Sequence, residues 1–277
     1  MAAQAGAVGD SGSKVVTRIR LLGSPLDIAP QAAILAAIDR RLAGSTAHCL
    51  HIATSNPEYV MQARSNPEFL AALDRADFVT CDGIGTLLAA KILASGEGAE
   101  RLSGTDLTTY FAERSGFEQD GGFFLLGGMD AVAASISLQQ AYPSARIAGA
   151  WSGGSAEPEH DAESIRRIVV GGADVVLVAY GAPGQVMWID RNIDGLSKAG
   201  VRVSIGVGGV LDYWSGHAER APENWRRSGL EWLYRLLREP WRWRRQLVLP
   251  KFACLVGWSA IFQHGRFLKT RVTGRAA

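Results

Sequence analysis

Asp82 stands where the sequence best suits chemistry. The apolar run Phe78–Cys81 ends in this acid, and Gly83 and Gly85 follow before a helical pattern begins. This order predicts a strand, a tight turn and a helix, and ligands of open α/β sheets bind beyond the carboxyl ends of the strands. Asp82 is therefore the first candidate catalytic residue. The alternative is that Asp82 only caps the following helix, because Asp is a favoured N-cap residue.

Glycine-rich turns follow several predicted strands and suit an anion such as a nucleotide phosphate. Unobstructed backbone N–H groups and helix N-termini attract negative charge. Gly83–Gly85 and Leu126–Gly128 do not complete the GxGxxG pattern of dinucleotide sites, and no acid follows the first strand at the distance that would hold a ribose. A nicotinamide-dependent oxidoreductase is thus an alternative with little support. The sequence also has no P-loop pattern and no compact DxD triplet.

Other polar residues have ordinary structural explanations. Thr54 and Asn56 precede Pro57 at a predicted helix start, and both can act as helix caps. A second Asn-Pro-Glu sequence, Asn66–Glu68, predicts the same capping at the next helix. Four histidines are expected to be strand residues or solvated side chains: His48, His51, His160 and His217.

No metal site is expected. The three cysteines, Cys49, Cys81 and Cys254, are widely spaced in largely apolar runs, which suits buried thiols in a reducing compartment. Cys49 shares a predicted strand face with His51, but no further ligand lies at zinc-site spacing.

Strand and helix patterns alternate from Val15 to Val207, and most predicted strands are continuously apolar. That pattern indicates a Rossmann-like parallel sheet covered on both faces by helices. The 277 residues provide one large domain with an appendage. We expect a disordered tail at 1–14, an α/β domain at 15–220 and a helical, membrane-associating appendage at 221–277. We expect no secretory signal, because no basic region followed by an apolar core occurs near residue 1.

The appendage is rich in arginine and tryptophan, although the net charge of the chain is only +2. Eight arginines and three glutamates lie between Arg220 and Arg245, and six of the eight tryptophans follow Val210. Residues 246–262 are largely apolar, but they are fewer than the roughly 20 that a spanning helix needs. An interfacial helix on anionic lipid fits this composition. A helix packed on the main domain and a nucleic-acid surface are the alternatives.

Eight motifs, in order and at family-like spacing, give the chain a resemblance to a known family. They are Thr54–Glu58, Cys81–Gly85, Arg101–Leu107, Phe124–Gly128, Gly181–Gln185, Gly206–Gly209, Arg220–Pro222 and Leu230–Leu236. Together they resemble the WecG/TagA/CpsF family of bacterial glycosyltransferases over about residues 15–245. Each motif alone is common, but eight in sequence are specific.

The resemblance implies an inverting hexosyltransferase that needs neither metal nor cofactor. Such an enzyme moves a sugar, here expected to be N-acetylmannosamine, from a UDP-sugar to a sugar on undecaprenyl diphosphate. It works in cell-surface polysaccharide biosynthesis, attached peripherally to the cytoplasmic face of the membrane. The expected partners are therefore the donor, the lipid-linked acceptor and the membrane surface, with no nucleic acid, and a homo-oligomer stays open.

Roles follow from the resemblance position by position. Asp82 matches the acid proposed as general base, and a carboxylate suits that role if the cleft raises its pKa. Other positions match residues of the substrate pocket: Thr54, Asn56, Arg101 and Gln185. Three arginines match those of the appendage that close over the UDP diphosphate: Arg235, Arg242 and Arg245.

The chain departs from the family at three positions. Gly184 and Val186 stand where the family usually has Lys and Glu, and Ser55 replaces a frequent proline. The loss of the charge pair beside Gln185 could signal a different donor sugar or a shifted helix start. A glucosyltransferase of exopolysaccharide assembly and a non-catalytic membrane-associated scaffold are therefore the alternative functions.

Overall fold

Six parallel strands form the central sheet of the computed structural model, which describes residues 16–44, 48–94, 98–114, 122–240 and 243–273. The strands lie in the order β4 (Phe78–Cys81), β3 (Leu50–Ser55), β8 (Val203–Gly206), β7 (Ala173–Ala179), β5 (Gly122–Gly127) and β6 (Ile147–Trp151). All five neighbouring pairs run parallel. The predicted α/β fold class is confirmed.

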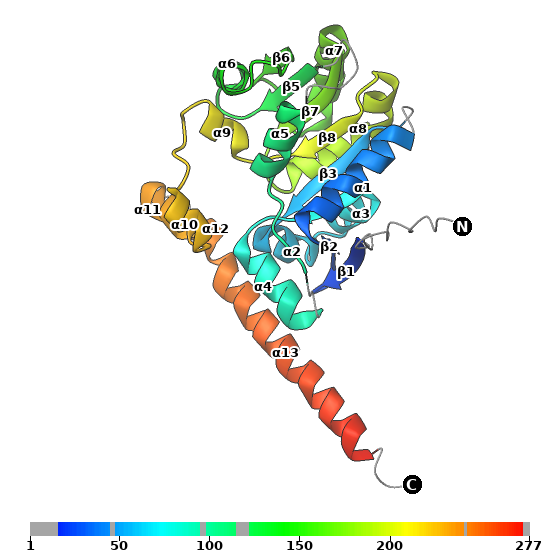
Figure 1. Cartoon of the computed structure of the whole chain (residues 1–277), viewed down its shortest axis with the longest axis vertical. Helices are drawn as coiled ribbons and strands as arrows, with labels where there is room; N and C mark the ends of the chain where they lie inside the picture. The colour runs from blue at the N-terminus through cyan, green and yellow to red at the C-terminus, as the bar shows by residue number, and fades with distance from the viewer. Residues whose placement is uncertain (1–15, 45–47, 95–97, 115–121, 241–242, 274–277) are drawn as a thin grey trace, which may run out of the picture.

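Helices cover both faces of this sheet (Figure 1). On one face lie α1 (Gln31–Gly44), α5 (Gly104–Glu113) and α6 (Ala131–Ala141), and on the other lie α3 (Pro67–Arg75), α7 (Asp161–Gly171) and α8 (Gly184–Lys198). Strand β7 shows why both faces need cover. Val175 and Leu177 pack in the first core, whereas Val176 and Val178 pack in the second.

The first predicted strand lies outside the parallel sheet. β1 (Thr17–Leu21) pairs antiparallel with β2 (Ser24–Ile28), and the two form a separate hairpin. The turn residues Leu22 and Gly23 both have positive φ, as tight two-residue hairpin turns require. β2 was not predicted, because Pro25 within such a run argues against a strand except at a sheet edge.

In the described part of the chain, four α-helices follow the last strand of the sheet and the short helix α9 (Val210–Trp214). They are α10 (Glu223–Arg227), α11 (Glu231–Arg238), α12 (Trp243–Gln246) and α13 (Val248–Thr273). The first part of α13 packs on α2 (Pro57–Ala63) and α4 (Ile84–Leu93), and the rest runs away from the domain (Figure 1). No helix in the described part of the chain is long and apolar enough to cross a membrane.

The buried carboxylate of Asp27 fastens the hairpin to the sheet. It accepts two hydrogen bonds of 2.8 Å from the Arg18 guanidinium and one of 2.7 Å from the backbone N–H of Val79, at the start of β4. A buried carboxylate needs such partners, since an unpaired one loses its hydration without compensation.

Replacing Asp27 by Asn should lower the free energy of unfolding by about 2–4 kcal/mol, because Arg18 loses its buried counter-charge. Urea unfolding followed by circular dichroism measures this change. The control is Asp74→Asn, which breaks the exposed Arg20–Asp74 pair and should cost less than about 1 kcal/mol. Equal effects of the two substitutions would show that the Asp27 contacts do not hold the hairpin.

Candidate active site

The carboxyl ends of β3, β4 and β8 meet at one edge of the sheet. In the ladders, Thr54 pairs with Thr80 and Ala53 pairs with Gly206. The backbone N–H of Asp82 continues the ladder by donating to Ser55 at 2.8 Å. The polar residues that follow β3 and β4 are thereby brought side by side.

A cleft of about 1160 Å³ lies over this edge, and its walls come from both ends of the chain. Seven of the eight predicted site residues line it: Thr54, Asn56, Asp82, Arg101, Gln185, Arg235 and Arg245. The eighth, Arg242, lies outside the described residues. The fold therefore brings Asp82 into one cleft with side chains that are more than 100 positions away.

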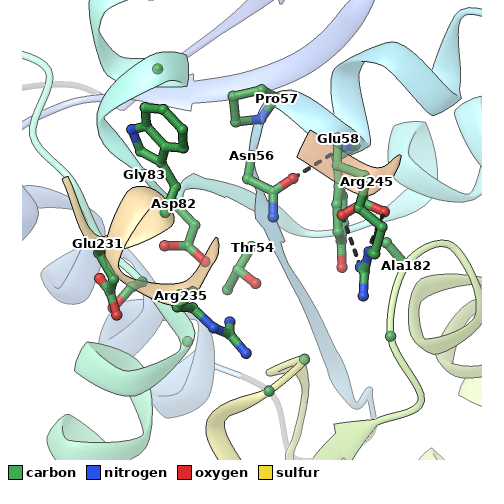
Figure 2. A pocket seen from close by; sticks show the side chains of 18 of the residues that line it. Thr54, Asn56, Pro57, Glu58, Asp82, Gly83, Ala182, Glu231, Arg235 and Arg245 are labelled. Carbon is green, nitrogen blue, oxygen red and sulfur yellow. Dashed lines mark hydrogen bonds and ion pairs between the residues drawn. The ribbon is translucent and has the colours of Figure 1, made fainter. Parts of the chain in front are cut away.

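Asp82 does not cap the helix that follows it. Gly83 is the N-cap residue of α4, with φ 96°, a conformation that favours glycine, and no side-chain cap hydrogen bond forms there. The Asp82 carboxyl instead points into the cleft between Thr54 and Arg235 (Figure 2). Among the described residues the capping alternative is therefore wrong.

Burial raises the pKa of Asp82 from its ordinary value of 3.8 to about 7. Arg101 and Arg235 oppose this rise through their positive charge, whereas Glu231 and Asp106 add to it. Arg101 and Glu231 in turn face each other, 3.7 Å apart. A carboxyl group with this pKa can take up or release a proton near neutral pH.

Asn56 both caps helix α2 and lines the cleft. Its Oδ1 accepts the backbone N–H of Tyr59 at 3.1 Å, at the start of α2, as the capping alternative predicts. The rest of its amide faces the cleft (Figure 2). Thr54 is no cap, since its hydroxyl donates to the carbonyl of Gly206 at 2.8 Å and ties β3 to β8.

Gln185 connects two segments that line the cleft. Its side chain is only 2% exposed, its Nε2 donates to the Tyr59 hydroxyl at 2.6 Å, and its Oε1 accepts the N–H of Gly208 at 2.9 Å. The amide therefore links α2 to the loop after β8. Tyr59 is a residue that sequence reasoning missed, because nothing in the local sequence reveals a contact with Gln185.

The two departures beside Gln185 are part of the packing. A Cβ on Gly184 would lie 2.7 Å from the Cβ of Ala156, so a lysine there would force the loop to shift. Val186 is fully buried among apolar residues that include Ala53 and Phe69, where a glutamate would lose its hydration. Both residues fit this chain's own core.

Several arginine side chains line the cleft. Arg235 lies over the Tyr213 ring, 5.0 Å from its centroid. Its Nε and one terminal nitrogen are buried without a hydrogen-bond partner among the described residues, and that nitrogen lies 4.0 Å from Oε1 of Glu239. Arg245 forms an ion pair with Glu58 at 2.9 Å. Arg220 also lines the cleft and has a buried Nε without such a partner. Buried, unsatisfied donors of this kind suit an anionic ligand.

Sequence reasoning did not assign Arg220 and Glu231 to the site, although both lie in motifs that it singled out. Their signal was the motif alone, because only the folded C-terminal segment brings them to the cleft that contains Asp82. Within the described part of the chain, no group of three or more His, Cys, Asp or Glu side chains is placed to hold a metal ion.

The raised pKa makes Asp82 a cost to stability that varies with pH. The folded protein holds the proton more tightly than the unfolded chain, so stability falls as pH rises from about 4 to about 7. Asp82→Asn should therefore raise the free energy of unfolding by roughly 2–4 kcal/mol at pH 8, and by less than about 1 kcal/mol at pH 4. Urea titrations at both pH values test this. The same gain at both would show that the carboxyl is not perturbed.

The chain was compared with known proteins. The family model described as "Glycosyl transferase WecG/TagA/CpsF family" matches residues 19–266. Two similar proteins are each named N-acetylglucosaminyldiphosphoundecaprenol N-acetyl-beta-D-mannosaminyltransferase. The protein from Bacillus spizizenii is 33% identical over 216 residues, covering 78% of this chain and 79% of its own. The protein from Bacillus subtilis is 34% identical over 209 residues, covering 74% and 78%. The chain therefore belongs to the WecG/TagA/CpsF family and is a glycosyltransferase.

Proposed function

We propose that this enzyme transfers N-acetylmannosamine from a UDP-sugar to a sugar on undecaprenyl diphosphate during cell-surface polysaccharide biosynthesis. The transfer inverts the anomeric centre and needs no metal. The names of the two Bacillus proteins support the transferred sugar and the lipid-linked acceptor. The observation that carries the proposal is a carboxyl group of pKa about 7 in a cleft lined by arginines.

In the proposed reaction Asp82 is the general base. Its carboxylate takes the proton from the acceptor hydroxyl while that oxygen bonds to the anomeric carbon of the donor. The bond from this carbon to the diphosphate oxygen breaks, and UDP leaves with the electron pair. A base with a pKa near the working pH is efficient, because it is ionised yet still holds a proton well. The proton then passes from Asp82 to solvent.

The arginines supply the positive charge that the leaving diphosphate needs. Arg235 and Arg220 carry buried donors without a hydrogen-bond partner among the described residues. Arg101 lines the same cleft, and its charge acts on the Asp82 carboxyl. Guanidinium groups bind phosphate oxygens with two directed donors, so they stabilise charge as it develops. Arg245 would reach the same ligand by leaving Glu58, and Arg242 stays a predicted contact.

The polar groups at the end of β3 would orient the sugars. The Asn56 amide faces the cleft, and Thr54 and Gln185 hold the strands and loops around it. We therefore assign Asn56 to direct substrate contact. Thr54 and Gln185 lie deeper, and we assign them to positioning this wall.

We also propose peripheral attachment to the cytoplasmic face of the membrane. Four large apolar side chains are exposed on the C-terminal helices: Trp243, Trp258, Ile261 and Phe262. Two arginines, Arg244 and Arg245, share α12 with Trp243. Aromatic side chains favour the headgroup region and arginines favour anionic lipid. A homo-oligomer stays a prediction.

A donor screen tests the function directly. The purified protein is incubated with N-acetylglucosamine on a short-chain polyprenyl diphosphate and with a panel of UDP-sugars, and UDP release and product mass are measured. Transfer from UDP-N-acetylmannosamine is expected. Transfer from UDP-glucose instead would favour the glucosyltransferase alternative, and no transfer from any donor would contradict the proposal.

Asp82→Asn should reduce kcat by about 100-fold or more, because an amide cannot accept the proton. Donor binding, measured by calorimetry with UDP, should stay within a few-fold of the wild type. The wild-type kcat/KM should rise with pH up to about 7 and then level off, as ionisation of Asp82 predicts. Unchanged turnover in the variant would remove Asp82 from the chemistry.

Arg235→Ala should weaken UDP binding and raise the KM for the donor by about 10-fold or more, because a charge-assisted contact to phosphate is lost. The matched control is Arg238→Ala on the same helix. Arg238 pairs with Glu219 at 2.8 Å and does not line the cleft. If both variants behaved alike, the effect would reflect the helix rather than the contact.

A further inference from the structure

The cleft continues beyond the charged region as an apolar groove between α4 and α13. We name this groove by its lining residues from the two helices: Ile84, Gly85, Leu88, Ala89, Ile92, Val248, Leu249, Phe252, Ala253, Val256, Gly257 and Ala260. None of them is charged or polar. The catalytic chemistry described above uses no part of it.

Some residues of the groove are buried between the two helices, and others are exposed. Phe252 and Val256 are buried, and they pack α13 onto Ala89 and Ala90 of α4. Leu88 is 50% exposed and Ile92 is 53% exposed, although both line the cleft. Two large aliphatic side chains of the groove are therefore exposed to water.

One end of the groove meets the reacting centre. Ile84 begins α4 two residues after Asp82, and Leu88 and Ile92 lie one and two turns further along the same face. From Ile84 to Ile92 the helix extends about 12 Å at 1.5 Å per residue. The cleft thus changes from arginines and carboxylates at one end to hydrocarbon at the other.

We propose that this groove binds the first part of the polyisoprenoid chain of the lipid-linked acceptor. This inference rests on the proposed function. An amphipathic ligand with a charged diphosphate sugar and a hydrocarbon tail matches the change of character along the cleft. Burying the tail against Leu88 and Ile92 removes apolar surface from water on both partners. The groove thereby aligns the acceptor sugar with Asp82 while the distal tail stays in the bilayer.

Gly257 is a position in the groove where a side chain can be added. A Cβ built on this residue meets no atom within 4 Å, although Gly257 lines the cleft. The Cβ of a leucine at this position therefore meets no protein atom, and the larger side chain is added to the lining of the cleft. Replacing glycine within a helix also favours the helix, so the variant is expected to fold.

The test compares two acceptors that carry the same sugar diphosphate, one on undecaprenol and one on a water-soluble chain of two isoprene units. The wild type should prefer the long chain, with a KM about 10-fold lower or better. The double variant Leu88→Gln/Ile92→Gln and the variant Gly257→Leu should each bring the ratio of the two KM values close to 1. The matched controls are Ile136→Gln, at a site 53% exposed on α6, and Cys254→Leu on α13 outside the groove, which should keep the wild-type ratio.

Binding to liposomes of anionic lipid separates the groove from a membrane surface. We expect the groove variants to bind liposomes as the wild type does while losing the preference for the long chain. Parallel loss of liposome binding would overturn the proposal, because the side chains would then contact the bilayer itself. An unchanged KM ratio in the variants would also overturn it and leave the proposed reaction intact. No transfer by the wild type to either acceptor would instead contradict the proposed function.

Discussion

The parallel register of β3 with its two neighbours is the constraint on which the site depends. Because β4 and β8 flank β3, the loops that follow three strands open at one edge, and the N–H of Asp82 is fixed to Ser55. Thr54 and Gln185 then lock the neighbouring loop after β8. A slip of one residue in the pairing of β3 would turn Thr54 to the opposite face of the sheet, since side chains along a strand alternate between its two faces. Site geometry and strand pairing are therefore set together.

Charge in this site works against stability. The negative charges of Glu231 and Asp106 act on the Asp82 carboxyl group, and buried donors of Arg235 lack hydrogen-bond partners among the described residues. A protein selected for stability alone would hydrate or neutralise such groups. Their retention fits a ligand that brings several negative charges, because the ligand satisfies the donors that the protein leaves open.

The sequence was most informative where the signal was local. The strand, acid and glycine turn placed Asp82, and two Asn-Pro-Glu sequences predicted the caps Asn56 and Asn66, both confirmed. It was uninformative where distant segments meet. Tyr59 reaches Gln185 across 126 positions, and the groove between α4 and α13 exists only after the last helix has docked. No periodicity within either segment encodes such a meeting.

Helices α11, α12 and α13 contribute lining residues to the cleft, and they are synthesised after the rest of it. A nascent chain can complete the sheet and the pocket around Asp82 while the wall that contains Arg235 and Arg245 is still missing. Under the proposed reaction, the immature chain therefore lacks two of the arginines that we assign to the diphosphate, although Arg101 and Arg220 are already present. The complete cleft then forms only late in translation, after the helices α11 to α13 have emerged.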